Sequence, residues 1–251
     1  MNPDANRPVS RSPSPTFSPL YRQIKEFMIK SLEAGEWGPG DAIPSEAELA
    51  TRFNVSQGTV RKAIDEMAAE NLLVRRQGKG TFVATHNDPR SYYRFLRLVA
   101  DDGDEAHSTS EPLSCEPVPA SPEVARVLGL QPGDPVVLLE RLLRFGADPV
   151  VLDQIYLAGE QFQALTLERL QASDRSLYSM FETDFGVRMI RAEERLRAVA
   201  ADAHSAGLLG VPEGEPLLLV ERTTFTYGNK PVEWRRGLYY TRRHHYLNEL
   251  G

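Results

Sequence analysis

The segment from Ile43 to Val83 restricts the fold of this chain more than any other feature. It opens with the pattern S-x-x-E after a proline, in which the hydroxyl of Ser45 can cap a helix and Glu48 can reach back to the free backbone donors. The helical pattern stops near Asn54, and Ser56 can cap a following helix in the same way. Two short helices joined by a tight turn are therefore predicted.

The second of these helices has two distinct faces. Its apolar residues recur at helical spacing and are expected in the core: Val60, Ala63, Ile64 and Met67. Hydrogen-bonding and cationic residues point outward in its first two turns: Gln57, Thr59, Arg61 and Lys62. A helix of this width fits the major groove of DNA, and its amino-terminal donors favour phosphate. This helix is the predicted recognition helix.

A basic hairpin is predicted after Leu72, where strand-forming residues flank a turn with two glycines. Gly78 and Gly80 allow the backbone to approach a partner closely. The cations Arg75, Arg76 and Lys79 are placed to contact a sugar-phosphate strand or a minor groove.

A supporting helix is predicted upstream, with Ser18 as its cap and Pro19 as its first residue. Its expected apolar stripe consists of Leu20, Ile24, Phe27, Met28 and Leu32. The helices and the hairpin together make a three-helix core with a wing.

The motifs PLYRQI from Pro19, FNVSQGTVRKAI and RRQGKGTFV resemble the winged helix-turn-helix domain of GntR-type bacterial transcription regulators. The expected DNA contacts are Ser45, Ser56, Gln57, Gly58, Thr59, Arg61, Lys62, Arg75, Arg76, Gln77, Gly78, Lys79 and Gly80. The family commonly carries arginine where this chain has Ala47 and Gln57, so we expect an operator that differs from the family's usual one.

The net charge of −6 is unevenly distributed along the 251 residues. Up to His86 the chain has 11 Lys and Arg against 10 Asp and Glu, and the remainder has 18 against 25. Cations gathered on one face of the head must therefore attract DNA, and its binding is expected to weaken steeply with salt. The acidic excess lies in a second domain, for which the chain is long enough.

The single cysteine, Cys115, excludes an internal disulfide framework and fits the reducing bacterial cytoplasm. We interpret it as an ordinary thiol. No apolar run approaches membrane-spanning length, so no membrane partner is expected. The first seventeen residues are rich in Pro and Ser and are expected to be disordered.

An internal repeat organises the second domain. LGLQPGDPVVLLER from Leu128 is echoed by LGVPEGEPLLLVER from Leu209, and each copy is followed by a glycine-bearing turn and another strand. A loose polar stretch is expected from 101 to 111, a helix after Ser176 and a strand from 187 to 199. The predicted fold class is α+β, with helices packed on an antiparallel sheet.

The stretch from Tyr92 to Leu247 resembles the effector-binding (UTRA) domain of the HutC branch of GntR regulators, which has a chorismate-lyase-like fold. The resemblance implies ligand contacts at Arg141, Asp153, Ser176, Tyr178, Glu233 and Tyr239. A small anionic metabolite is the expected ligand, since an arginine and a helix start both favour anions. The relatives that sense sugar phosphates usually carry an arginine where this chain has Leu143, which favours a carboxylate over a sugar phosphate.

Purely structural roles stay open for these residues. Arg141 together with Glu140, and Arg222 together with Glu221, could form ion pairs with neighbouring strands only. Ser176 could serve only as a helix cap, and the two tyrosines could be core aromatics.

Two other classes of protein remain as alternatives: an enzyme of chorismate-lyase-like fold, and a ligand-independent DNA-binding protein. Zinc-type spacing and the H-E-x-x-H, Walker and G-x-S-x-G motifs are absent from the sequence, and His244 and His245 would diverge on a strand. We therefore expect no catalytic residues, metal site or cofactor.

The sequence predicts a homodimeric repressor that binds a palindromic operator in double-stranded DNA and responds to a ligand. The expected domains are a tail at 1–17, the head at 18–84, a linker at 85–95, and an effector-binding and dimerisation domain at 96–251.

Overall fold

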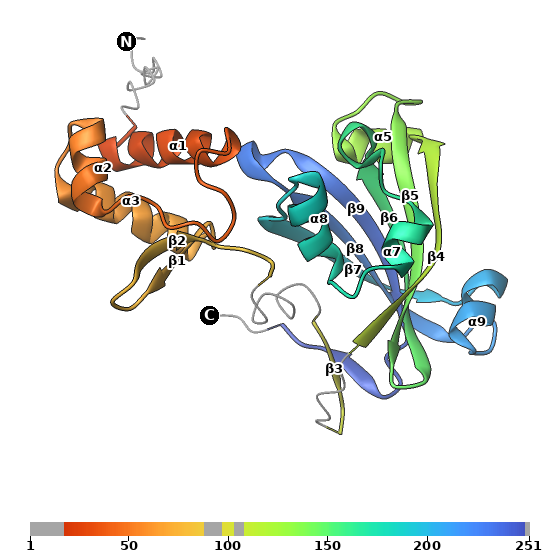
Figure 1. The fold of residues 1–251 in the computed structure, drawn as a ribbon. Coiled ribbons are helices and arrows are strands. Elements are labelled where there is room, and N and C mark those ends of the chain that lie inside the picture. Colours follow the sequence, from red (N-terminus) through yellow and green to blue (C-terminus); the bar gives the residue numbers. More distant parts are fainter. Residues whose placement is uncertain (1–17, 88–96, 103–107, 249–251) are drawn as a thin grey trace, which may run out of the picture.

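The computed structural model describes residues 18–87, 97–102 and 108–248. Within them the chain forms a helical head followed by a larger unit built on an antiparallel sheet (Figure 1), so the predicted α+β class is confirmed. The tail expected to be disordered, 1–17, lies outside the described residues, as do positions 88–95 of the expected linker.

Three helices and a hairpin make up the head. They are α1 (Leu20–Glu33), α2 (Glu46–Phe53), α3 (Gln57–Ala69), β1 (Leu73–Arg76) and β2 (Gly80–Val83). Their apolar faces meet in one core that contains Ile24, Met28, Leu32, Trp37, Leu49, Val60, Ile64 and Met67. β1 and β2 pair antiparallel, so the predicted three-helix core with a wing is confirmed.

Both predicted helix caps are present. The Ser45 hydroxyl accepts the backbone N–H of Glu48 at 3.3 Å, and the Glu48 carboxylate accepts the backbone N–H of Ser45 at 2.8 Å. The Ser56 hydroxyl accepts the N–H of Thr59 at 3.2 Å. Asn54 closes α2 in the left-handed region, at φ 53°, which turns the chain sharply into α3.

The start of α1 differs from the prediction. The helix begins at Leu20, and Pro19 is its N-cap, without a capping side chain. Leu20 and Phe27 are 51% and 49% exposed, so they were wrongly assigned to the buried stripe. The buried apolar residues are spaced four apart, and Phe27 lies one position off this row, where its ring stacks on Phe53 near the surface.

The larger unit is a six-stranded antiparallel sheet with strand order β4-β5-β6-β9-β8-β7. Its strands are β4 (Ser108–Pro119), β5 (Pro135–Phe145), β6 (Asp148–Ala158), β7 (Arg191–Ala200), β8 (Pro216–Phe225) and β9 (Pro231–Tyr239). The helical segments are α5 (Pro122–Leu128), α6 (Gly159–Phe162), α7 (Leu167–Gln171), α8 (Leu177–Phe185), α9 (Ala203–Leu209) and η1 (Tyr227–Asn229).

The sheet is built from the two copies of the sequence repeat. Each copy supplies an outer strand, a short helix and a hairpin, β4-α5-β5-β6 in one and β7-α9-β8-β9 in the other. The copies meet where β6 pairs with β9, so both hairpins share one sheet as predicted. On each side of this central pair the next strand is the first strand of the hairpin, and the outer strand of the copy lies at the edge of the sheet.

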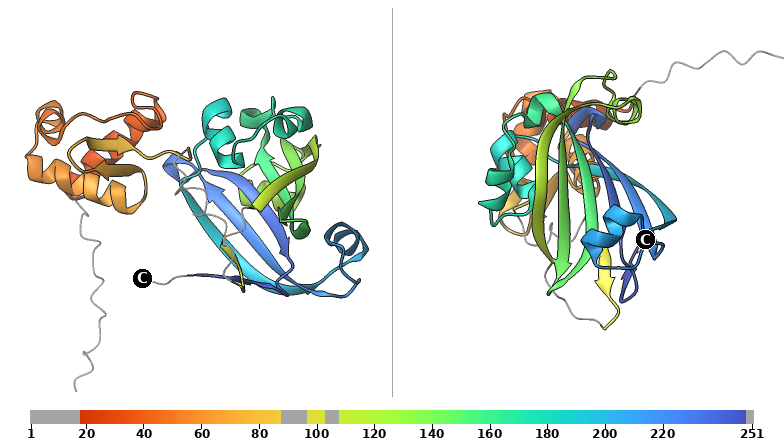
Figure 2. Two further views of the ribbon diagram at one scale, coloured as in Figure 1. Left: turned by 60° about the horizontal axis from the view of Figure 1, so that its bottom comes forward. Right: turned by 90° about the vertical axis from the view of Figure 1, so that its right-hand side faces the viewer.

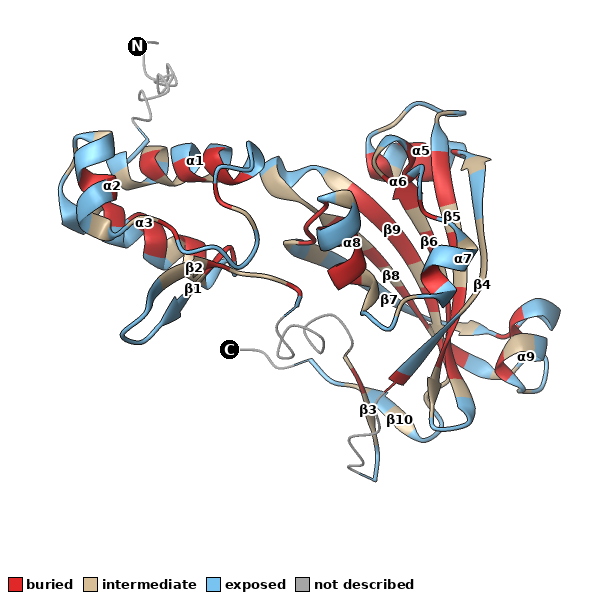
Figure 3. Cartoon of the chain, in the orientation of Figure 1, coloured by how far each residue is buried: buried red, intermediate tan, exposed pale blue. Residues whose placement is uncertain are grey.

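Helices cover both faces of the sheet. α6, α7 and α8 pack against alternate residues of β5 and β6 such as Val137, Leu139 and Ile155. α5 and α9 pack on the other face, against Val136 and Leu142. Figure 2 shows α8 and α9 on opposite sides of the strands, and Figure 3 shows buried residues along the central strands.

The polar stretch expected from 101 to 111 is wrong at its end, because β4 already begins at Ser108. β4 is an edge strand whose first polar residues pair with the end of β5 and keep one side in water. Positions 103–107 lie outside the described residues. A separate small sheet joins β3 (Leu98–Ala100) to β10 (His244–Tyr246).

Candidate functional site: a nucleic-acid interface and a cavity

The exposed side of α3 carries the residues expected to contact DNA. Gln57, Gly58, Arg61 and Lys62 are exposed, and Thr59 is half-buried. The opposite side of α3 is packed in the core of the head, so the amino end of this helix is free to enter a groove.

The wing lies beside α3, and the carboxylate of Glu46 binds an arginine from each of them. Glu46 accepts a hydrogen bond from Nε of Arg61 at 2.8 Å and lies 3.4 Å from Nη2 of Arg75. Arg75 also pairs with Asp65 at 2.6 Å. The hydrogen bond from Arg61 lowers the pKa of Glu46, which therefore stays ionised and orients both arginines.

The rest of the predicted interface is solvent-exposed. It consists of Ser45, Ser56, Arg76, Gln77, Gly78, Lys79 and Gly80. Gly78 and Gly80 have φ of 69° and 109°, a backbone conformation that suits glycine, and they form the tip of the wing. Sequence reasoning overlooked Glu46 and Asp65, whose pairing with the cations depends on how α2, α3 and β1 meet.

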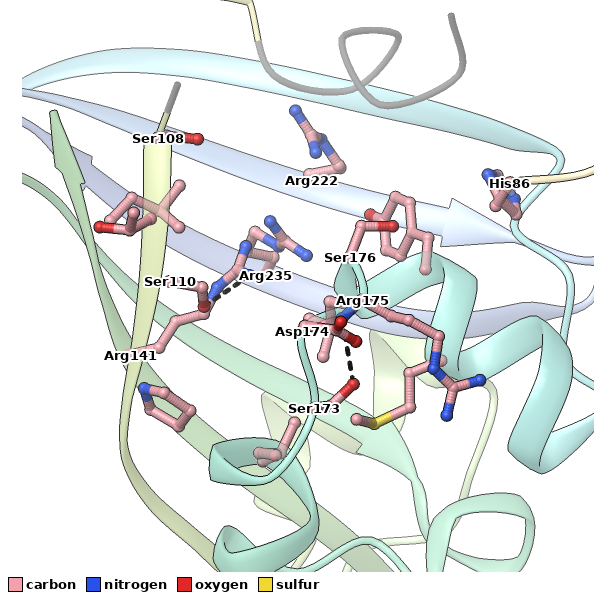
Figure 4. Close-up of a pocket in the computed structure, with 17 residues that line it drawn as sticks. His86, Ser108, Ser110, Arg141, Ser173, Asp174, Arg175, Ser176, Arg222 and Arg235 are labelled. Atoms are coloured by element: carbon pink, nitrogen blue, oxygen red, sulfur yellow. Dashed lines mark hydrogen bonds between the residues drawn. The ribbon is translucent and has the colours of Figure 1, made fainter. Parts of the chain in front are cut away.

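The larger unit contains a cavity of about 340 Å³ between one face of the sheet and α8. Three arginines line it from three strands, Arg141 of β5, Arg222 of β8 and Arg235 of β9. Ser176 lines it from the start of α8 (Figure 4), and so does Tyr178 in the first turn. The cavity thus brings together three of the six predicted ligand contacts: Arg141, Ser176 and Tyr178.

The other three predicted contacts lie beneath the wall of the cavity. Asp153 and Glu233 are 0% exposed and Tyr239 is 2% exposed. Asp153 accepts hydrogen bonds from Nε and Nη2 of Arg141 at 3.0 and 2.9 Å. These buried groups support the residues that line the cavity.

Arg235 joins the two buried carboxylates into one network. Its Nη1 lies 3.3 Å from Asp153 and its Nε donates to Glu233 at 3.0 Å. The Tyr178 hydroxyl donates to the same oxygen of Glu233 at 3.0 Å. Among the described residues Nη2 of Arg235 has no hydrogen-bond acceptor, so it remains available to a ligand.

Burial raises the pKa of both tyrosines above its ordinary value. It raises the pKa of Tyr178, and the charge of Glu233 adds to the effect. Burial also raises the pKa of Tyr239 to about 12. Both phenols are therefore hydrogen-bond donors near neutral pH, which suits their places beside carboxylates.

Arg222 and Arg235 were missed as cavity residues, although the sequence holds signals for both. Arg222 ends the second copy of the repeat as Arg141 ends the first. Arg235 follows Glu233 by two residues and therefore shares its face of β9. The positive charge missing at Leu143, which itself lines the cavity, is thus supplied from other strands.

Arg222 forms an ion pair with the neighbouring strand β7, as the structural alternative supposed. Its Nη2 lies 2.5 Å from Glu194 of β7. Arg222 nevertheless lines the cavity, so the structural role and the ligand role are compatible.

Cys115 allows a simple chemical prediction. Burial raises the pKa of its thiol to about 11, and its Sγ lies 3.6 Å from the carbonyl oxygen of Leu165. At pH 8 about one thiol in a thousand is then ionised, so iodoacetamide should label Cys115 about 100-fold more slowly than an ordinary cysteine. Because the pKa is raised, the rate should increase about tenfold per pH unit up to pH ~11. Mass spectrometry would measure it, with protein unfolded in denaturant as the control; equal rates at pH 8 would contradict the prediction.

Among residues 18–87, 97–102 and 108–248, His, Cys, Asp and Glu side chains form no group of three that could hold a metal ion. None of the described helices is long and apolar enough to span a membrane.

Comparison with known proteins agrees with this architecture. The family described as "Bacterial regulatory proteins, gntR family" matches residues 20–83, and the UTRA domain matches residues 105–245. The HTH-type transcriptional regulator YurK of Bacillus subtilis is 30% identical over 90% of this chain and 93% of its own length. The HTH-type transcriptional repressor NagR of the same species is 27% identical over 92% of this chain and 96% of its own.

Solved structures give the same result. The ligand-binding domain of a regulator assigned to the GntR family, from Bordetella bronchiseptica, is 49% identical with a TM-score of 0.62, and covers 63% of this chain and 99% of its own. PhnF from Mycobacterium smegmatis is 25% identical with a TM-score of 0.51, covering 90% of this chain and 96% of its own. The chain therefore belongs to the gntR family of bacterial regulatory proteins and carries a UTRA domain, within a group of transcriptional regulators rather than enzymes.

Proposed function

We propose that the protein is a homodimeric repressor that binds a palindromic operator and responds to a small anionic metabolite. Residues 18–84 would form the DNA-binding domain, 85–95 the linker, and 96–251 the effector-binding and dimerisation domain. Each recognition helix reads only a few base pairs, so two heads related by a two-fold axis multiply the discrimination between sequences.

The observation that supports DNA binding most directly is the cationic surface formed by α3 and the wing. Arg61 and Arg75 converge on Glu46, and the side chain of Arg61 is 60% exposed. The head therefore presents cations on one side although its net charge is close to zero. The repressor name of NagR supports the same function.

Replacing Arg61 with Ala tests this interface. The expected loss is about 1–3 kcal/mol of operator-binding free energy, which is typical for an arginine that contacts a base in two places. Fluorescence anisotropy with an operator selected from random DNA would measure it. Arg52→Ala is the matched control, because Arg52 is an exposed arginine of α2 that pairs with Glu36. Unchanged affinity of Arg61→Ala would remove Arg61 from the interface.

The cavity supports an anionic ligand. Arg141, Arg222 and Arg235 provide charged donors, and the amino end of α8 opens on the same space. With positive charge arriving from three strands, a sugar phosphate fits the cavity as well as a carboxylate does. A thermal-shift screen of phosphorylated sugars, amino-acid catabolites and organic acids would identify the class, because a ligand stabilises the state that it binds.

The ligand must favour one arrangement of the heads over another in order to control DNA binding. The cavity is suited to this role because His86, in the expected linker, lies on its wall. A ligand that fills the cavity therefore contacts or displaces the chain that leaves the head.

A further inference from the structure

Arg188 connects the larger unit to the end of the recognition helix. Its Nη2 donates to the carbonyl oxygen of Asn71 at 3.0 Å, and its Nη1 donates to that of Leu72 at 3.3 Å. Nη1 also donates to the Tyr227 hydroxyl at 3.0 Å. The Arg188 side chain is only 4% exposed, so this contact is fixed in a buried position.

The position of this guanidinium has a clear electrostatic reason. α3 ends at Ala69, and the chain then turns through Asn71, which has φ of 57°. The carboxyl end of a helix carries partial negative charge, and the carbonyl oxygens of Asn71 and Leu72 lie just beyond this end. A buried arginine just beyond that end is therefore held by both charge and hydrogen bonds.

Glu182 of α8 completes the connection. Its Oε2 lies 3.6 Å from Nε of Arg188, and the Glu182 side chain is 1% exposed. The same carboxylate accepts the backbone N–H of His86 at 3.1 and 3.2 Å, and it also accepts the Thr85 hydroxyl. We call Glu182 and Arg188 the clasp, since together they hold the chain that leaves the head and the end of α3.

The clasp and the cavity share one helix. Ser176 and Tyr178, at the start of α8, line the cavity, whereas Glu182 lies in its later turns. His86 links the two regions a second time, because it lines the cavity and its Nε2 lies 2.8 Å from the carbonyl oxygen of Met189. A shift of α8 must therefore move groups that hold the head.

We propose that the clasp sets the orientation of the recognition helix relative to the larger unit, with α8 as the element that joins the cavity to it. The inference rests on the proposed function for its consequence in DNA binding. The physical connection itself depends only on the contacts of Arg188 and Glu182.

The first test is X-ray scattering of the full-length protein without DNA. R188M replaces the guanidinium with an apolar side chain, and Glu182 keeps its bonds from the linker. The radius of gyration and the maximum dimension should both increase as the head loosens. R191M is the matched control, because Arg191 lies three residues further on and pairs with Glu193 and Asn229 rather than the head.

A double variant keeps the test decisive if R188M does not fold. R188M with E182Q removes both buried charges, so neither is left without its partner. The double variant should expand as R188M does. E182Q alone should also expand, because a neutral amide holds a guanidinium more weakly than a carboxylate does. Its expansion should be smaller than that of R188M, because Arg188 keeps its bonds to Asn71 and Leu72.

The second test measures how strictly the heads are spaced. The probe is a palindromic duplex that the wild-type protein selects from a random library, together with the same duplex lengthened at its centre by two base pairs, about a fifth of a helical turn. Wild type and R191M should bind the lengthened duplex at least about 10-fold more weakly, whereas R188M should lose no more than about 3-fold, since loosely held heads adapt to both spacings.

The outcomes separate the two proposals. Unchanged scattering and unchanged spacing preference in R188M and the double variant would overturn the clasp. Expansion in R188M with wild-type behaviour in E182Q would remove α8 from the connection and overturn that part of the inference. If the wild-type protein selects no palindrome, the proposed function fails, while the scattering result still decides the clasp.

Discussion

Replacing Arg141 with Ala is expected to weaken binding of the anionic ligand at least about 100-fold while leaving operator binding unchanged. A hydrogen bond to a charged group contributes about 1.5–3 kcal/mol, and each 1.4 kcal/mol is a factor of ten, so the loss of two such bonds is sufficient. Titration calorimetry with the ligand from the thermal-shift screen would measure the loss. Release of the variant from its operator at the wild-type ligand concentration would show that the ligand site is elsewhere.

The fold should tolerate this change. Asp153, which loses Arg141, keeps Arg235 at 3.3 Å as a counter-ion, so no buried carboxylate is left alone. Arg144→Ala is the matched control. Arg144 lies on the same strand and pairs with Glu111 at 2.6 Å, with its side chain 32% exposed, so its loss should leave ligand binding as it is.

Replacing Gly159 with Ala is expected to destabilise the larger unit by about 3 kcal/mol or more. A Cβ at Gly159 would lie 2.0 Å from the carbonyl oxygen of Pro135 and 2.6 Å from its carbonyl carbon. These are backbone atoms at the start of β5, so they cannot rotate away as a side chain would. Overpacking of this kind usually costs about 1–3 kcal/mol, and a clash with backbone lies at the upper end of that range or above it.

Denaturant unfolding monitored by circular dichroism would measure the change, with Gly207→Ala as its control. Gly207 also lies in a helix, α9, but a Cβ there would meet nothing within 4 Å. Because alanine favours helices over glycine by about 0.5–1 kcal/mol, the control should be neutral or slightly more stable. Wild-type stability of Gly159→Ala would show that α6 does not pack against β5 as closely as described.

The ion pairs beside the cavity have a second function besides ligand binding, which is to hold the arginines in position. The guanidiniums that reach the cavity from the sheet are each paired with a carboxylate, which fixes their positions before a ligand arrives. Arg141 pairs with Asp153, Arg222 with Glu194, and Arg235 with both Asp153 and Glu233. Gly237 makes room for this layer, since a Cβ there would lie 2.8 Å from Oδ1 of Asp153. Groups already held in place lose less freedom on binding.

The head could be predicted almost completely from the sequence. Its signals are local: Ser45 and Ser56 cap helices that start one residue later, and the glycines of the wing mark a turn. Local hydrogen bonds depend on residues three or four apart in the chain, so a sequence pattern contains them. The errors lie in α1, which begins one residue later than predicted and leaves Leu20 and Phe27 exposed.

The internal repeat likewise determined that two hairpins share one antiparallel sheet. Which strands of the two hairpins meet was decided only by the tertiary structure, and the cavity depends on that order. β6 lies between β5 and β9, so Asp153 can bind Arg141 and Arg235, which are 94 positions apart in the printed sequence. Pairing between strands so distant in the chain leaves no periodic signal, so the sequence could place Arg235 on the same face as Glu233 but could not show that it pairs with Asp153.

The sequence by itself determined the family, the helix-turn-helix with its wing and the repeated hairpins, because caps, turns and alternation act over a few residues. Only the tertiary structure decided how the arginines of the cavity are paired and how Arg188 reaches the end of α3. Those contacts arise from the packing of distant segments, where burial makes each charge depend on a partner that sequence spacing does not reveal.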